Sequence, residues 1–165
     1  MQKGENKMKV LSFDQSTRAS GYAYFEDGKY IESGVIDMKK SELETEERSF
    51  EMAKKLWKVL RKYKPEILII EDVQQQSNAK TMIVLARLAG MIIGYAEAHK
   101  VKVHIIKPSQ WRSMLHFKQG AGVKREELKR QSINYVKKTY DIDASEDECE
   151  AIALGDGAHI KYKLV

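Results

Sequence analysis

The sequence predicts an α/β fold in which helices cover both faces of one five-stranded mixed sheet. Three strand-like segments come first, and two further strands then alternate with helical segments. Asp27-Gly28 separates the second and third segments and is a strong hairpin signal, so we expect the first three strands to be antiparallel. The uninterrupted apolar run at 67–70 is typical of a strand covered on both faces, which favours a parallel arrangement for the last two strands.

Residue patterns predict the individual elements. Alternating or continuous apolar, β-branched and aromatic residues predict strands at 8–14, 21–25, 29–37, 67–71 and 101–106. Apolar residues at helical spacing predict helices at 41–64, 78–99, 108–115, 124–140 and 145–161.

Local signals refine the helix predictions. A capping box beginning at Ser41 should start the first helix, with Phe50 on its inner face, and Pro65 should end it. In the helix at 124–140 we expect Ile133 to face inward. In the last helix Asp156 falls opposite the acidic first turn, and we expect it at the surface.

Composition and length favour one soluble domain. We expect a single domain at 8–165 after a disordered polar leader at 1–7, which lacks the apolar stretch of a signal peptide. No apolar run is expected to reach membrane-spanning length, so no membrane partner is predicted. The single Cys149 cannot form an internal disulfide, which fits the reducing cytoplasm.

Charge is unevenly distributed along the chain. Residues 99–140 hold eleven Lys or Arg against Glu126 and Glu127, a net +9, whereas the whole chain carries +5. An acidic stretch at 141–150 follows directly, with six acids and no base. A basic surface beside an acidic pocket suits a polyanion brought to a metal centre, although a Lys-rich solvated helix face would give the same pattern.

Four acids are candidates for that metal centre. Asp14 ends the first predicted strand and Glu71 the fourth, while Asp147 and Glu150 stand at the start of the last helix. Carboxylates at the ends of buried strands are costly unless they meet a cation or a donor, and clustered oxygens suit Mg²⁺ or Mn²⁺. Spacing alone does not choose between Glu146 and Asp147, because both lie within reach of the face that carries Glu150.

Three segments carry a family resemblance. They are Leu11 to Ala23 with its strand-end Asp, Ile69-Ile70-Glu71-Asp72-Val73, and Asp147-Glu148-Cys149-Glu150-Ala151-Ile152-Ala153. In this order the chain resembles the ribonuclease H-like fold, and more narrowly the RuvC family of Holliday junction resolvases, from about residue 9 to 159. The family has a second Asp where this chain has Glu150, which reaches one methylene further.

The resemblance implies an activity and its cofactor. It implies a homodimeric endonuclease that cuts four-way and other branched DNA by paired nicks, leaving 5′-phosphate and 3′-hydroxyl ends. Two Mg²⁺ ions are expected, with Mn²⁺ as a substitute, held by Asp14, Glu71, Asp147 and Glu150. The helix at 78–99 is the candidate dimer interface, with core packing as its other interpretation.

The resemblance also assigns DNA contacts. Arg112 and Lys124 occupy positions where the family carries functional lysines near the scissile phosphate, and Lys118 and Arg125 are expected on the same DNA face. Gln74 stands where family members can carry an aromatic wedge, so stacking at the junction centre should be lost there.

Three other functions remain open at this point. A related nuclease of the YqgF type would act on structured RNA, and a non-catalytic binder would hold branched DNA without cutting it. An actin-like ATPase or sugar kinase also opens on a strand that ends in Asp, but it needs two such domains, for which 165 residues are too few.

Overall fold

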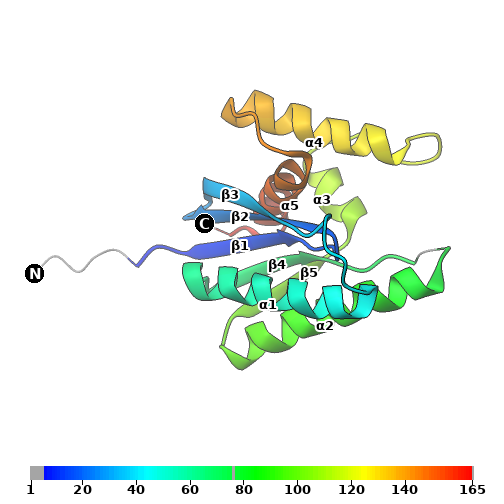
Figure 1. The fold of residues 1–165 in the computed structure, drawn as a ribbon. Helices are drawn as coiled ribbons and strands as arrows, with labels where there is room; N and C mark the ends of the chain where they lie inside the picture. Colours follow the sequence, from blue (N-terminus) through cyan, green and yellow to red (C-terminus); the bar gives the residue numbers. More distant parts are fainter. Residues whose placement is uncertain (1–5, 76, 165) are drawn as a thin grey trace, which may run out of the picture.

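A single mixed sheet runs through the centre of the molecule (Figure 1). The computed structural model describes residues 6–75 and 77–164. The strands are β1 (Lys9–Asp14), β2 (Ala19–Glu26), β3 (Lys29–Asp37), β4 (Ile67–Glu71) and β5 (Lys102–Ile106), in the spatial order β3-β2-β1-β4-β5. The first three strands pair antiparallel, and β1, β4 and β5 pair parallel. The predicted α/β fold is confirmed.

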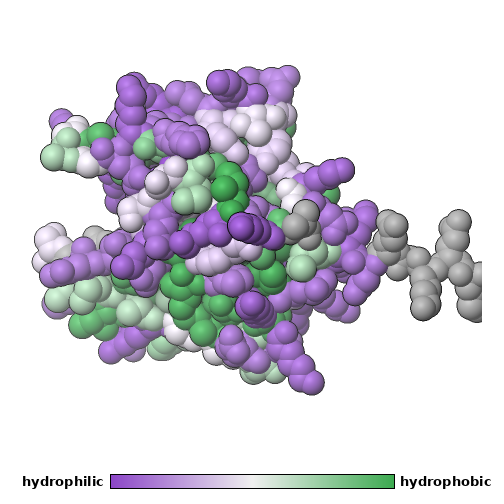
Figure 2. All heavy atoms as spheres, turned by 180° about the vertical axis from the view of Figure 1, so that it is seen from behind, coloured by the Kyte–Doolittle hydropathy of each residue, from purple (hydrophilic) through white to green (hydrophobic). Residues whose placement is uncertain are grey.

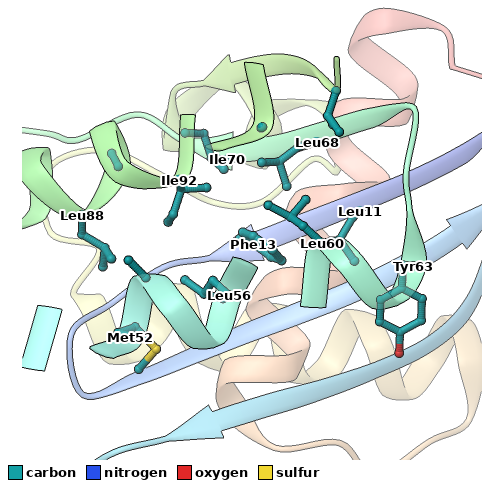
Figure 3. Close-up of a cluster of buried hydrophobic side chains, with 14 of the residues drawn as sticks. Leu11, Phe13, Met52, Leu56, Leu60, Tyr63, Leu68, Ile70, Leu88 and Ile92 are labelled. Atoms are coloured by element: carbon teal, nitrogen blue, oxygen red, sulfur yellow. The ribbon is translucent and has the colours of Figure 1, made fainter. Parts of the chain in front are cut away.

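Helices cover both faces of this sheet (Figure 1). One face carries α1 (Thr45–Tyr63) and α2 (Ala79–Ala98), and the other carries α3 (Pro108–Met114), α4 (Arg125–Tyr140) and α5 (Glu146–Tyr162). Because side chains alternate along a strand, Leu11 and Phe13 of β1 enter the core beneath α1 and α2 (Figure 3). Val10 enters the core on the α5 side. Most of the predicted leader, residues 1–5, lies outside the described residues.

The helix α5 is buried on almost every side, because it lies between the sheet and α4 (Figure 1). A Cβ at Gly155 would come within 2.4 Å of the Phe25 ring, so only glycine allows this close approach. The Ser12 hydroxyl donates a hydrogen bond of 2.7 Å to the Ala151 carbonyl, which fixes α5 along β1. As predicted, Ser145 caps this helix through the Glu148 amide.

Four of the local predictions were wrong. The first helix begins at Thr45, because Ser41 accepts from the Leu43 amide and no capping box forms. Phe50 is 41% exposed and Ile133 is 38% exposed, since α1 and α4 each pack along one narrow side. Asp156 is buried rather than solvated, because α4 covers it and Tyr135 and Tyr140 of that helix donate hydrogen bonds of 2.8 and 2.7 Å to its Oδ2.

A further correction concerns α2. Within the described residues it is the one helix long and apolar enough to cross a membrane by length and composition, contrary to the expectation that no run would be. Only 22% of its apolar window is buried in the chain. Its inner residues Leu88, Ala89, Ile92 and Ala96 belong to the core, and Met91, Ile93 and Tyr95 are half-buried against it. Figure 2 shows hydrophobic side chains gathered on this side of the molecule, among hydrophilic ones.

Candidate active site

Asp14 and Glu71 lie at the same edge of the sheet. They are the last residues of β1 and β4, which run parallel with Phe13 opposite Ile70. Asp14 has the same side-chain parity as Val10, and Glu71 the same parity as Ile69, and both of these apolar residues face α5. The two carboxylates therefore project from neighbouring strand ends toward the α5 layer.

The first turn of α5 is brought against this edge by a glycine. Gly21 of β2 pairs with Asp14, and a Cβ built at Gly21 would lie 2.0 Å from the carbonyl oxygen of Asp147. Only a residue without a side chain lets the helix come this close to the strand. The contact brings the turn that carries Asp147 and Glu150 to the strand ends that carry Asp14 and Glu71.

The charges of the other three acids act on Asp14. Burial raises the pKa of Asp14 well above its ordinary value, and the charges of Glu71, Glu150 and Asp147 raise it further, in that order. Burial raises the pKa of Glu150 to about 7, against the opposing effect of Arg112. Burial also raises the pKa values of Glu71 and Asp147. Bringing these acids together is unfavourable in the absence of positive charge.

Residues of α3 contact two of the acids. The indole nitrogen of Trp111 donates a hydrogen bond of 2.8 Å to Glu71 Oε2. The Arg112 guanidinium lies 4.0 Å from Glu150 Oε2. Glu150 is 8% exposed, and among the described residues its buried Oε1 has no hydrogen-bond partner within bonding distance, although the nearby Ser132 hydroxyl lowers the pKa of this carboxyl. Gln15 donates from its side chain to the Glu71 backbone carbonyl at 2.8 Å, which ties the two strand ends together.

The donor set fits a hard divalent cation. Within the described part of the chain no three His, Cys, Asp or Glu side chains already stand at metal-binding separation. The charges of Glu71, Glu150 and Asp147 nevertheless act on Asp14, Glu150 is buried while the other three acids are half-buried, and among the described residues Glu150 Oε1 is a buried acceptor that lacks a donor. A cation would satisfy that oxygen and offset the repulsion, and carboxylate oxygens are the ligands that Mg²⁺ and Mn²⁺ prefer.

Comparison with known proteins identifies a family that matches this chain. Residues 10–155 match the family described as "Crossover junction endodeoxyribonuclease RuvC". The chain belongs to the RuvC family. The predicted resemblance is confirmed, and so is the fold.

Individual relatives are similar over different spans. RuvC of Fusobacterium nucleatum is 32% identical over 107 residues, and that of Syntrophomonas wolfei 33% identical over 107 residues. These matches take in 62% of this chain but only 56% and 62% of the relatives' own length. RuvC of Dictyoglomus thermophilum is 28% identical over 151 residues, which are 89% of this chain and 93% of that relative.

Two solved structures have the same fold. Thermus thermophilus RuvC in complex with a Holliday junction substrate has a TM-score of 0.69 at 15% identity, covering 94% of this chain and 95% of the other. The yeast mitochondrial Holliday junction resolvase has a TM-score of 0.56 at 16% identity, covering 93% and 80%. At these identities the likeness concerns the fold.

Glu146 and Asp147 are distinguished by their partners in this RuvC-family chain. The Glu146 carboxylate forms an ion pair with Lys129 of α4, and its side chain is 45% exposed. Asp147 is less exposed, and its charge contributes to the raised pKa of Asp14. The ion pair directs Glu146 toward α4, whereas Asp147 is the one of the two whose charge raises the pKa of Asp14.

The predicted DNA contacts are dispersed around this centre. Arg112 lies beside Glu150, and the charge of Arg125, at the start of α4, lowers the pKa of Glu71. Lys124 is the exposed residue before α4, and Lys118 lies in the loop after α3, where its backbone pairs with the Gln131 side chain. Among the described residues, neither lysine side chain forms an ion pair with the four acids.

Gln74 shares a cavity with two of the acids. It stands at the rim of a cavity of about 90 Å³ that Asp14, Gln15 and Glu71 also line. Its side chain is exposed, and the amide nitrogen donates to the Asp72 carbonyl at 3.3 Å.

Sequence reasoning missed three residues of the site. Trp111 and Gln15 both hold Glu71, one by its carboxylate and one by its backbone. Lys129 pairs with Glu146 and opposes the raised pKa of Asp14, Asp147 and Glu150. Gln15 directly follows the strand-end Asp14, and this position could have predicted that Gln15 lies in the site. No local sequence pattern indicated that Trp111 or Lys129 belongs to the site, because their partners are distant in sequence.

Proposed function

We propose that this chain is a divalent-metal-dependent endonuclease that resolves four-way DNA junctions by paired nicks. Its family is one of divalent-metal-dependent nucleases. The observation that carries the proposal is the convergence of Asp14, Glu71, Asp147 and Glu150 at one sheet edge, with their pKa values raised by burial and, at Asp14, by mutual repulsion. We expect the activity in the cytoplasm, where the lone buried Cys149 stays reduced.

The four acids would hold two Mg²⁺ ions, with Mn²⁺ as a substitute. Bound ions supply positive charge that lowers the pKa of an attacking water and stabilises the departing oxygen. Asp14 is electrostatically coupled to the other three acids, which supports its role as the shared ligand. Glu150 would contribute its unpaired Oε1, and Arg112 beside it would offset charge on the phosphate.

The basic helix α4 would guide the DNA backbone. A groove of about 410 Å³ between α4 and the start of α5 is lined by Arg125, Lys129 and Arg130 together with Glu126, Ile133 and Glu146. Lys124 directly precedes the same helix, and the Lys118 backbone pairs with the side chain of Gln131 within it. Phosphate contacts release counterions, so binding should weaken steeply as salt is raised.

The loop after β4 would meet the junction centre. Gln74 is exposed at the rim of the cavity that Asp14 and Glu71 line. An amide side chain can hydrogen-bond a base edge but lacks the ring on which an unpaired base would stack. We therefore expect this chain to recognise the junction centre through polar contacts.

The outer face of α2 would form a homodimer interface. Ile83 is 46% exposed there, and a Cβ at Gly90 or Gly94 would meet nothing within 4 Å, so both glycines leave room for a second helix. A two-fold dimer presents two equivalent sites to the two strands of a four-way junction. Light scattering should give about twice 19.0 kDa, and a strict monomer at working concentrations would contradict paired nicking.

One cleavage experiment tests the function. A labelled four-way junction, a replication fork, a linear duplex and a structured RNA are incubated with the protein and Mg²⁺, and nicks are mapped on every strand. We expect symmetric nicks in the junction and an intact duplex. Preferential cutting of the RNA would favour the YqgF-type alternative. Tight junction binding with no nicks in Mg²⁺ or Mn²⁺ would make the protein a non-catalytic binder.

A further inference from the structure

Trp111 is an indole placed against a carboxylate of the site. Its ring is fully buried, and Nε1 donates to Glu71 Oε2 at 2.8 Å. The next residue, Arg112, lies over the same ring at 4.9 Å and stands 4.0 Å from Glu150. Two adjacent residues of α3 thus contact two acids that come from different elements of the fold.

Packing fixes the position of this indole. Phe117 meets the ring edge-on at 5.9 Å, and a Cβ at Gly157 of α5 would lie 2.7 Å from the Trp111 carbonyl oxygen. The side chain therefore has little freedom to swing away. An indole N–H can only donate, so it orients the carboxylate without competing for a cation.

The hydrogen bond uses one of the two carboxylate oxygens. Glu71 Oε2 accepts the hydrogen bond from the indole N–H, and no protein group in the described part of the chain donates to Oε1. We propose that Trp111 is a positioning residue that holds Glu71 by Oε2 and leaves Oε1 for a divalent ion. This inference rests on the metal centre of the proposed function, and it assigns to a buried tryptophan a role beyond filling the core.

The chain offers a matched control for this role. Its only other tryptophan, Trp57, also donates its N–H, to the Met91 carbonyl at 3.2 Å, but it lies on α1 across the sheet. Trp57→Phe and Trp111→Phe each remove one indole N–H from a packed aromatic site. Each single variant also leaves one tryptophan, so its fluorescence reports on one face of the sheet.

The experiment measures metal binding without DNA. Free Mn²⁺ is followed by electron paramagnetic resonance, and tryptophan emission is followed during a Mg²⁺ titration. Removing groups that orient metal ligands weakens metal affinity roughly 10–100-fold, so we expect a loss of that size in Trp111→Phe and no loss in Trp57→Phe. In Trp57→Phe, the emission of Trp111 should change with Mg²⁺, and adding Asp14→Asn should abolish that change.

The outcomes separate this inference from the proposed function. Equal Mn²⁺ affinity in the two variants, both with native circular dichroism, would overturn the positioning role while leaving the metal centre standing. No Mn²⁺ binding by the unaltered protein would overturn the metal centre, and this inference with it. If Trp111→Phe does not fold, the Mg²⁺ titration of Trp57→Phe tests the inference by itself. Trp111 emission that stays unchanged while Mg²⁺ binds would then overturn the positioning role.

Discussion

Gly21 is the point at which the sheet touches the acidic turn of α5. A Cβ there would lie 2.0 Å from the Asp147 carbonyl oxygen and 2.5 Å from its carbonyl carbon, about 1.4 Å inside the 3.4 Å at which ordinary contact begins. The obstacle is helix backbone, which cannot rotate out of the way as a side-chain tip can. Gly21→Ala should therefore push the first turn of α5 off the sheet by on the order of 1 Å.

A displacement of this size should affect cleavage more than folding. Misplacing a catalytic group by about 1 Å can cost roughly 100-fold in rate, and inserting a methyl into a packed contact costs about 1–3 kcal/mol of stability. We expect the single-turnover rate of junction cleavage in Mg²⁺ to fall by about two orders of magnitude. Thermal unfolding should still be cooperative, and junction binding should change little.

Gly34→Ala is the control for this substitution. Gly34 lies in the neighbouring strand β3, and a Cβ there would meet the hydroxyl of the half-buried Tyr22 at 2.4 Å, which is the end of a side chain and not helix backbone. This variant should cleave close to the normal rate. Full activity of Gly21→Ala, or an equal loss in Gly34→Ala, would refute the idea that this glycine sets the position of the acidic turn.

Three further predictions concern charge in and around the site. Asp14→Asn should bind junctions normally in a gel-shift assay but leave them uncut in Mg²⁺, and normal cleavage would remove Asp14 from the centre. Lys124→Ala should weaken junction binding or turnover across a salt titration, and unaltered behaviour in both would place Lys124 off the DNA path. Glu150 has a pKa of about 7 in the folded chain, above its ordinary 4.5, so its contribution to stability is full below about pH 4.5 and is lost as pH rises through 7. The melting temperature of the metal-free protein should therefore fall between about pH 5 and 8, less so in Glu150→Gln, and identical profiles would contradict this reasoning.

Strand-end positions could be predicted from the sequence because they follow from local pattern and topology. Asp14 and Glu71 each close an apolar run, and parallel strands bring their carboxyl ends to one edge. The cap of α5 at Ser145 was equally local. The start of α1 was not, because Ser41 has the residue type of a cap yet its hydroxyl accepts from Leu43 in a turn.

The burial of Asp156 depended on tertiary context. A helical wheel assigns one face to solvent, whereas α5 has both faces covered, by the sheet and by α4. Small residues occur all around α5, for example Ala153, Gly155 and Ala158. This pattern could have predicted a helix that is covered on almost every side. The contact of Trp111 with Glu71 joins residues 40 positions apart and needed the packed α3.

The site is held together by parts of the fold that do not belong to it. Burial and repulsion oppose the approach of Asp147 and Glu150 to Asp14, so something must hold the first turn of α5 against the sheet. The Ser12 hydrogen bond to the Ala151 carbonyl and the glycine contact at Gly21 do this from the sheet side. Burial of the apolar cores on both faces of the sheet offsets the unfavourable free energy of holding these acids together. A cation bound among the acids would remove the opposing repulsion, so folding and metal binding favour each other in this chain.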